Sequence, residues 1–169
     1  MSASGASRLR VLLVEDSPLL AARLAEVIRQ LPDVELIGVA DTQADAESAL
    51  VRLAPDVMLL DLCLRQGTGF GVLRSQRDLK HRPTTVVLTN YSLPDYRRTA
   101  EALGASWFLD KATDCERLPQ ILTDLLVVKH GAGARSVVAR PVTTEPPVVA
   151  PATAPEAPAV TQTESTATL

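Results

Sequence analysis

The sequence is poor in aromatic residues, in cysteine and in long apolar runs. Aromatic residues make up only 3% of the chain although 46% is hydrophobic, so any core is aliphatic, as suits helices packed on a parallel sheet. Two cysteines, Cys63 and Cys115, are too few and too far apart for a disulfide framework, which favours a reducing compartment. No apolar stretch approaches the ~20 residues that a membrane helix needs. The run Val11–Val14 is also too short for a secretory signal. We therefore expect a cytoplasmic protein that does not enter a membrane.

An excess of positive charge is also missing. The formal net charge is −3 and the pI is near 5.4, so the composition does not support a broad nucleic-acid footprint. From Gly131 onward, prolines stand among Ala, Thr and Val, without an aromatic residue or a helical apolar stripe. Such a segment cannot bury enough apolar surface to offset chain ordering. We predict a disordered N-terminus over residues 1–7, a folded domain over 8–130 and a Pro/Ala/Thr-rich disordered tail over 131–169. Because that tail cannot form a helix-turn-helix, we expect no DNA-binding domain.

Between these ends, strand-like and helix-like segments alternate regularly. Short aliphatic runs predict buried parallel strands, and the segments between them have helical apolar spacing. The predicted strands are Leu9–Val14, Val34–Val39, Val57–Leu60, Thr85–Thr89 and Trp107–Leu109. This alternation predicts an α/β fold with a five-stranded, doubly wound parallel sheet, whose strand order the sequence leaves open. Three helix starts are predicted: Ser17 before Pro18, Thr42 before an acidic first turn, and a capping box from Thr113 to Glu116.

Several of these strands end on residues suited to phosphate or metal chemistry. Glu15 and Asp16 follow the first strand, Asp61 follows the third, Thr89 ends the fourth, and Lys111 stands just beyond the fifth. Ligands of open α/β sheets bind beyond the carboxyl ends of the strands, so these groups should gather at one edge. Clustered carboxylates repel one another, and Mg2+ relieves that repulsion while sharing oxygens with phosphate. Asp61 is the best candidate for a phosphoryl-accepting nucleophile. A hydroxyl and an ammonium group can hold the phosphoryl oxygens.

These motifs resemble the receiver domains of two-component response regulators, the CheY-like family. The resemblance rests on four segments in order: Val-Leu-Leu-Val-Glu15-Asp16-Ser-Pro, Val-Met-Leu-Leu-Asp61-Leu with two glycines beyond, Val-Val-Leu-Thr89, and Phe108-Leu-Asp-Lys111. It covers roughly residues 9 to 128, the whole predicted domain. It implies a flavodoxin-like receiver fold and a sensor histidine kinase or histidine phosphotransfer protein as the phosphoryl donor.

The resemblance also implies roles for individual residues. Asp61 matches the phosphoacceptor, while Thr89 and Lys111 match the residues that contact the phosphoryl group. Asp16, Asp61 and the backbone carbonyl of Cys63 match the direct Mg2+ ligands, and Glu15 matches the residue that acts through water. Phe108 occupies the position of the aromatic switch, whose burial follows movement of the threonine.

Three positions depart from the family pattern. Arg65 stands where a proline is common, and Ala112 replaces the proline that usually follows the lysine. We expect the loop at Ala112 to be trans or rearranged, because a cis bond before alanine costs roughly 3–4 kcal/mol. Asn90, next to Tyr91, replaces a small residue after the threonine. A larger side chain there would restrict the access of water, so we hypothesise a long-lived phosphorylated form.

The expected function is a single-domain response regulator receiver that takes a phosphoryl group onto Asp61 in a phosphorelay. We expect no enzymatic activity beyond slow loss of its own phosphoryl group. Its downstream protein target is expected on the face formed by the fourth helix, fifth strand and last helix. One alternative is a pseudo-receiver that binds partners without phosphorylation. Another is an aspartate-nucleophile phosphatase, although the second aspartate typical of those enzymes is Cys63 here.

Overall fold

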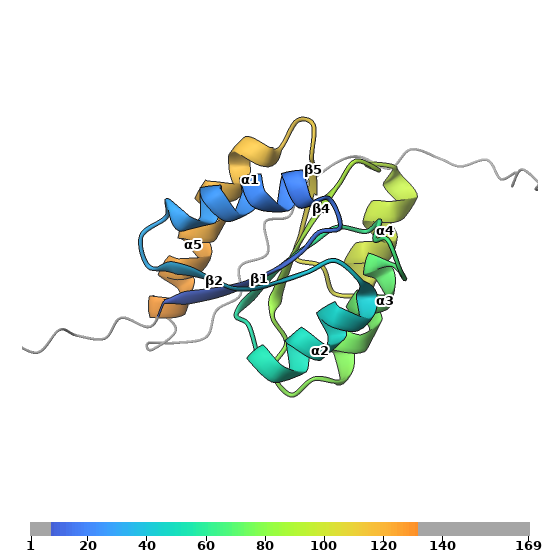
Figure 1. The fold of residues 1–169 in the computed structure, drawn as a ribbon, viewed down its shortest axis with the longest axis horizontal. Helices are drawn as coiled ribbons and strands as arrows, with labels where there is room; N and C mark the ends of the chain where they lie inside the picture. The colour runs from blue at the N-terminus through green and yellow to red at the C-terminus, as the bar shows by residue number, and fades with distance from the viewer. Residues whose placement is uncertain (1–7, 132–169) are drawn as a thin grey trace, which may run out of the picture. The chain divides into compact units, whose positions relative to one another are not determined.

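The computed structural model describes residues 8–131, which form one parallel sheet covered by helices on both faces (Figure 1). The sheet has five strands in the order β2-β1-β3-β4-β5, and every neighbouring pair is parallel. The strands are β1 (Leu9–Val14), β2 (Val34–Ala40), β3 (Val57–Leu60), β4 (Thr84–Thr89) and β5 (Trp107–Asp110). The predicted fold class is confirmed, and three of the predicted strand ranges differ from the observed ones by one residue. The predicted disordered ends, residues 1–7 and 132–169, lie outside the described residues.

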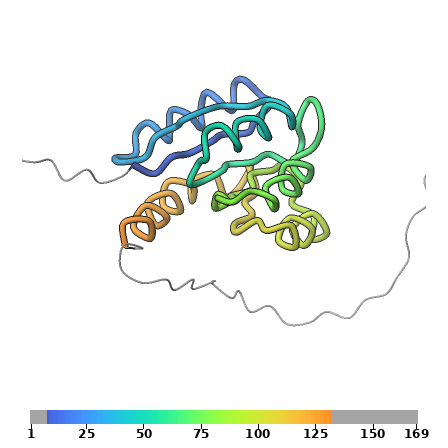
Figure 2. Tube along the Cα trace, turned by 90° about the horizontal axis from the view of Figure 1, so that it is seen from below, coloured from blue at the N-terminus to red at the C-terminus, as the bar shows by residue number. Residues whose placement is uncertain are grey.

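The connecting helices divide between the two faces of the sheet. They are α1 (Pro18–Arg29), α2 (Gln43–Leu53), α3 (Gly69–Ser75), α4 (Pro94–Ala102) and α5 (Leu118–Gly131), with short 3₁₀ turns η1 (Gln76–Asp78) and η2 (Cys115–Arg117). Helices α1 and α5 cover one face, whereas α2, α3 and α4 cover the other (Figures 1 and 2). None of the helices in the described part of the chain is long and apolar enough to cross a membrane.

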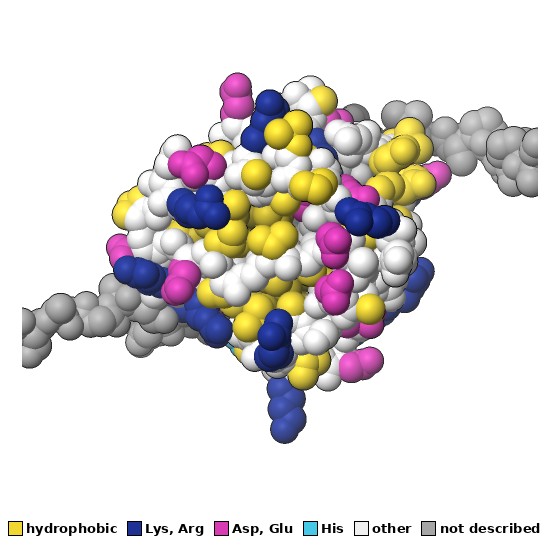
Figure 3. All heavy atoms as spheres, in the orientation of Figure 1, with side chains coloured by type: hydrophobic (Ala, Val, Ile, Leu, Met, Phe, Trp, Pro, Cys, Tyr) yellow, Lys and Arg dark blue, Asp and Glu magenta, His cyan; other side chains and the backbone are white. Residues whose placement is uncertain are grey.

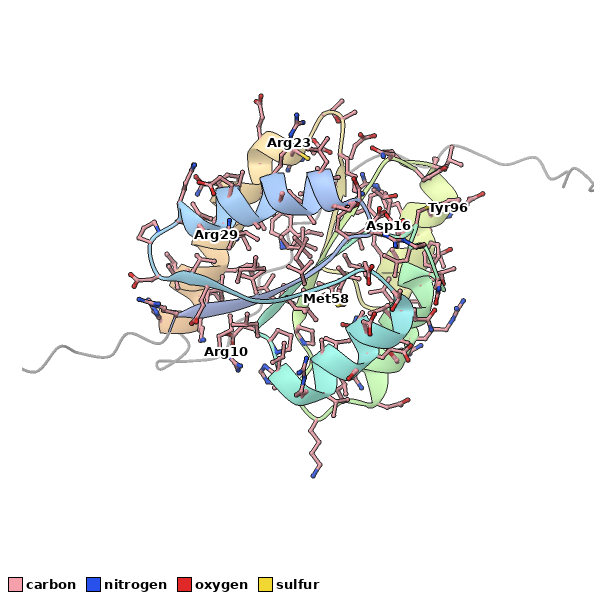
Figure 4. The ribbon with its side chains drawn as sticks, in the orientation of Figure 1. Arg10, Asp16, Arg23, Arg29, Met58 and Tyr96 are labelled. Carbon is pink, nitrogen blue, oxygen red and sulfur yellow. The ribbon has the colours of Figure 1, made fainter. Side chains whose placement is uncertain are left out.

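Each face of the sheet buries its own aliphatic cluster because successive strand residues point in opposite directions. On β1, Leu12 and Val14 join the cluster under α2, α3 and α4, whereas Val11 and Leu13 join the cluster under α1 and α5. Met58 of β3, labelled in Figure 4, is fully buried in the first of these clusters. The central strands are therefore buried on both faces, and their polar side chains stand only at the strand ends.

Two of the three predicted helix starts are confirmed. The Ser17 hydroxyl accepts a hydrogen bond from the backbone N–H of Leu20 at 3.4 Å at the start of α1. At the start of α2, the Thr42 hydroxyl accepts from the Asp45 N–H at 3.2 Å and donates to its carboxylate at 2.7 Å.

The third predicted start, the capping box from Thr113 to Glu116, is wrong. Helix α5 begins only at Leu118, after the 3₁₀ turn η2. The physical reason is Pro119: a helix started at Thr113 would place this proline in its interior, where its ring clashes and an N–H is missing. A start at Leu118 places Pro119 in the first turn, where no N–H is needed. The Asp114 carboxylate instead accepts a hydrogen bond from the Asp110 N–H at 3.1 Å and closes the turn after β5.

We expect the Thr42→Ala variant to lose about 1 kcal/mol in its free energy of unfolding, because the first turn of α2 loses its cap. Urea denaturation followed by circular dichroism measures the loss. Thr42→Ser keeps the hydroxyl and should retain most of the stability. An alanine variant as stable as the parent would show that this cap does not contribute to folding.

Candidate functional site

The candidate site lies where the chain leaves β1 and β3 at the carboxyl edge of the sheet. The last residues of these two strands, Val14 and Leu60, are aligned in register. The Asp61 N–H donates to the Val14 carbonyl at 2.9 Å, which continues the ladder by one residue. From β1 the chain leads to β2 on one side, and β3 lies on the other, so this edge is a topological switch point. The fold therefore brings the acids after β1 together with the acid after β3.

Three carboxylates form a compact cluster at this edge. Glu15, Asp16 and Asp61 each offer an oxygen, and these oxygens all lie within 4.8 Å of one another. Glu15 and Asp61 are buried, with 3% and 6% of their surfaces exposed, and Asp16 is half-buried. Carboxylates held so closely repel one another unless a cation lies among them. Their hard oxygen donors fit the preference of Mg2+, which binds one or two carboxylates and keeps several waters.

Lys111 supplies a positive charge to this cluster from the loop after β5. Its Nζ lies 2.7 Å from a Glu15 oxygen and 2.5 Å from an Asp61 oxygen, and its side chain is buried. Burial acts to lower the pKa of Lys111, but the hydrogen bonds to Asp61 and Glu15 outweigh it, so the pKa is raised. Burial raises the pKa of Glu15 despite the neighbouring ammonium group. Lys111 thus remains charged and ties the two buried carboxylates together.

Thr89 lies beside Lys111 at the end of β4. The Lys111 N–H donates to the Thr89 carbonyl at 3.0 Å, and the Thr89 side chain is buried. The Thr89 hydroxyl oxygen accepts a hydrogen bond from the Tyr91 N–H at 3.2 Å. This bond uses the oxygen as an acceptor, so the hydroxyl hydrogen can still be donated to a phosphoryl oxygen.

Phe108 is set apart from the carboxylates, in the apolar cluster under α2, α3 and α4. Only 5% of its surface is exposed, and the Arg97 guanidinium of α4 lies 4.7 Å from the centre of its ring. The structure therefore buries Phe108 beneath a cation of α4, and its role as a switch stays a prediction.

Cys63 contacts the cluster through its backbone. Its N–H donates to an Asp61 carboxylate oxygen at 3.1 Å, and it forms an isolated antiparallel bridge with Thr68. Burial and the Asp61 charge raise the pKa of the Cys63 thiol, which disfavours the reactive thiolate. The backbone N–H of Cys63 thus contacts the cluster, and the binding of Mg2+ by its carbonyl stays a prediction.

Two further residues, which the sequence motifs did not identify as functional, contact the site. The Arg65 guanidinium donates to the Asp16 backbone carbonyl at 3.2 Å, although the sequence marked Arg65 only as a departure from the family pattern. Gly69, the first residue of α3, packs directly on the backbone of Asp61, and its N–H donates to the Leu62 carbonyl at 3.0 Å. Gly69 is one of the two glycines counted in the family motif, and Arg65 departs from that motif; neither signal indicated a contact with Asp16 or Asp61.

Comparisons with known proteins agree with this geometry. A family model described as the response regulator receiver domain matches residues 11–123. A protein-glutamate methylesterase/protein-glutamine glutaminase of Carboxydothermus hydrogenoformans is 32% identical over 160 residues, which is 90% of this chain and 45% of the relative. The sensory transduction protein LytT of Bacillus cereus is 32% identical over 114 residues, 68% of this chain and 46% of the relative. The chain thus spans just under half the length of these curated relatives.

Solved structures show the same fold. The signal receiver domain of the putative response regulator NarL from Mycobacterium tuberculosis has a TM-score of 0.66 at 23% identity, covering 72% of this chain and 98% of that one. The response regulator domain of Thermotoga maritima CheB has a TM-score of 0.64 at 21% identity, covering 73% of this chain and 97% of that one.

Proposed function

Since this chain belongs to the family of response regulator receiver domains, we propose that it accepts a phosphoryl group on Asp61 from a sensor histidine kinase or a histidine phosphotransfer protein. One observation carries the proposal. The Asp61 carboxylate is buried among two further carboxylates and is contacted by Lys111 at 2.5 Å. A buried carboxylate among other acids can react with an electrophile whose negative charge is offset by a bound cation. A phosphoryl group bound to a divalent cation is such an electrophile.

Each residue of the site would have a distinct role in phosphoryl transfer. Receiver domains bind Mg2+ through acidic residues, and here Glu15, Asp16, Asp61 and the Cys63 carbonyl would hold it. The bound ion would orient the phosphoryl oxygens and neutralise their charge. An oxygen of Asp61 would form the new bond to phosphorus while the bond from phosphorus to the donor's histidine nitrogen breaks, and the ammonium group of Lys111 would stabilise the negative charge of the phosphoryl oxygens.

The signal would then pass from the site to a protein partner. A phosphoryl group on Asp61 adds negative charge and acceptor oxygens beside Thr89. Donation by the Thr89 hydroxyl would draw the loop after β4, and with it α4 and the contact between Arg97 and Phe108, into a second arrangement. We propose that a downstream protein reads this change on the face formed by α4, β5 and α5.

Phosphoryl uptake by the full chain tests this proposal. The protein is incubated with Mg2+ and acetyl phosphate, and its intact mass is measured. We expect a gain of one phosphoryl group in the parent and no gain in Asp61→Asn, while Asp124→Asn on the exposed side of α5 takes up phosphate like the parent. Uptake that survives in Asp61→Asn would overturn the site assignment. A parent that never takes up phosphate would instead indicate a binding module that works without phosphorylation.

The lifetime of the phosphorylated form gives a separate prediction about Asn90. Asn90 directly follows Thr89, and the neighbouring Tyr91 is stacked on Tyr96 with ring centres 6.1 Å apart. We infer that the Asn90 side chain, next to Thr89, would restrict the approach of water to a phosphoryl group on Asp61. We expect Asn90→Ala to lose its phosphoryl group about threefold faster, which is about 0.7 kcal/mol in the barrier. Decay of the phosphorylated mass measures the rate, with Asn90→Gln as a control of similar bulk. Equal half-lives for Asn90→Ala and the parent would refute the idea.

A further inference from the structure

The proposed reaction brings an anionic donor to an acidic edge of the protein. Glu15, Asp16 and Asp61 cluster there, and Asp41 follows β2 at the same edge. The positive charge of Lys111 is buried and already bound to two of these carboxylates. Lys111 and a bound Mg2+ would offset the charge of these inner carboxylates, but the half-exposed Asp41 still repels an approaching phosphate unless a further cation lies at the rim of the site.

Arg65 is a cation at that rim. Its guanidinium donates to the Asp16 carbonyl at 3.2 Å and lies 3.8 Å from a carboxylate oxygen of Asp41. Its side chain is 57% exposed, so its contact with Asp41 is screened by water and is weak. The space-filling view shows a basic side chain beside acidic ones near the loop that follows β1 (Figure 3). Arg65 is thus charged, accessible and held only loosely, unlike Lys111.

A pocket next to the acidic cluster includes Arg65 in its wall. Its volume is about 250 Å³, and its other lining residues are the acids Glu15, Asp16 and Asp41 and the apolar residues Pro18, Ala21 and Val39. A guanidinium offers several N–H donors in a planar fork that matches the oxygens of a phosphoryl group. Arg65 is the one basic residue among these lining residues, so it is the group that can bind the phosphoryl end of a donor. Asp61 does not line the pocket, but one of its oxygens lies within 4.8 Å of oxygens of Glu15 and Asp16, which do.

We propose that Arg65 captures the phosphoryl group of the incoming donor and delivers it to Asp61, which makes it a binding residue of the proposed phosphotransfer. This inference rests on the proposed function. In the step itself, an Asp61 carboxylate oxygen forms the bond to phosphorus while the donor's bond to phosphorus breaks. With acetyl phosphate, acetate leaves as the anion; with zwitterionic phosphoramidate, ammonia leaves with the protons that its nitrogen already carries. Arg65 stays protonated throughout and contacts only phosphoryl oxygens.

A purely structural role for Arg65 is the competing explanation. The bond from Arg65 to the Asp16 carbonyl could simply hold a metal-binding loop in place. In that case, removing Arg65 would weaken Mg2+ binding, whereas capture of the donor affects the KM for the donor and leaves Mg2+ binding intact. Measuring both quantities separates the two roles.

The test compares the Arg65→Gln and Arg65→Lys variants with the parent and with an Arg29→Gln control. Arg29 is an exposed arginine at the far end of α1 from Asp16, as the labels in Figure 4 show, and it also pairs with a carboxylate, that of Glu26. Initial rates are measured at saturating Mg2+ with increasing acetyl phosphate and, separately, phosphoramidate. Calorimetric titration without a donor gives the Mg2+ affinity.

We expect Arg65→Gln to raise KM about fivefold for both donors, which corresponds to about 1 kcal/mol. The kcat and the Mg2+ affinity should stay close to those of the parent, Arg65→Lys should recover most of the KM, and Arg29→Gln should leave all values unchanged. An unchanged KM, a loss of Mg2+ affinity that matches the rise in KM, or a rise confined to acetyl phosphate would overturn the assignment. A parent that takes up no phosphate would refute the proposed function itself, which is a different outcome.

Discussion

Without magnesium at pH 8, the Lys111→Met variant should unfold with a free energy about 3 kcal/mol below that of the parent. The parent holds the buried carboxylates of Glu15 and Asp61 on the Lys111 ammonium group, at 2.7 and 2.5 Å. Methionine fills a similar volume without charge, so both carboxylates stay buried and lose their common partner. Removing one member of a buried ionic group is costly because the remaining charges are left desolvated and, here, repel one another. Urea denaturation measures the difference.

The loss of unfolding free energy in Lys111→Met should depend on pH, and the titration of Glu15 determines whether it grows or shrinks as the pH rises. Burial already raises the pKa of Glu15 above its ordinary value of 4.5, while the contact with Lys111 opposes that rise. In Lys111→Met the contact that lowers the pKa of Glu15 is absent, so this pKa rises further. A carboxyl group whose pKa is higher in the folded state than in the unfolded state costs stability as the pH rises through that range. The Lys111 ammonium group of the parent is charged throughout this range because its own pKa is raised. The difference in unfolding free energy between variant and parent should therefore be smaller near pH 4.5 than at pH 8.

Magnesium and a second lysine provide the controls for this prediction. Mg2+ should stabilise Lys111→Met more than it stabilises the parent, because the ion replaces the missing charge among the same carboxylates. Lys129, at the other end of the sheet, pairs with the more exposed Asp56 at 2.6 Å. Lys129→Met should lose less stability and show no added response to Mg2+. An equal loss for Lys111→Met at both pH values would contradict the assignment of the effect to Glu15.

The contact between Lys111 and Asp61 shows how much of this site can be predicted from the sequence. The short aliphatic runs locate each strand end, and with it the residues that stand there. That the Lys111 ammonium group reaches Asp61 depends on strand order, because β4 lies between β3 and β5. Fifty positions separate the two residues in the chain, and no local pattern reports their distance. The strand ends predicted that both residues lie at one edge of the sheet, and the family resemblance matched both to the same phosphoryl group, but neither predicted their direct contact.

Residues that act across loops were harder to predict than residues at strand ends. The sequence shows Arg65 as an unusual residue after an acid, but its contact with the Asp16 carbonyl requires the loops after β1 and β3 to be neighbours.

The wrong prediction of the start of α5 has a different origin. The local capping signal at Thr113 competes with Pro119, and a proline restricts a helix more strongly than a favourable cap promotes one.

Replacing Gly69 with alanine should cost both stability and phosphoryl transfer. A Cβ at this position would lie 2.3 Å from the Asp61 backbone oxygen and 2.7 Å from the Leu62 Cα. These are backbone atoms at the end of the buried strand β3, so no side-chain rotation can relieve the overlap. We expect a loss of about 3 kcal/mol in the free energy of unfolding. Because relief requires Asp61 to move, we also expect the rate of phosphoryl uptake to fall by about 100-fold.

Gly71→Ala, in the same helix, separates this steric effect from a general effect of alanine in α3. A Cβ on Gly71 would meet only the end of the Gln43 side chain, 2.2 Å from its Oε1, and that amide can rotate away at the cost of its bond to the Thr68 N–H. Alanine also favours the helix by up to about 1 kcal/mol over glycine, which offsets part of the cost. Gly71→Ala should therefore keep its stability within about 1 kcal/mol of the parent and take up phosphate at a similar rate. If both alanine variants lost activity alike, the effect would belong to α3 as a whole, and close packing of Gly69 on Asp61 would not be its cause.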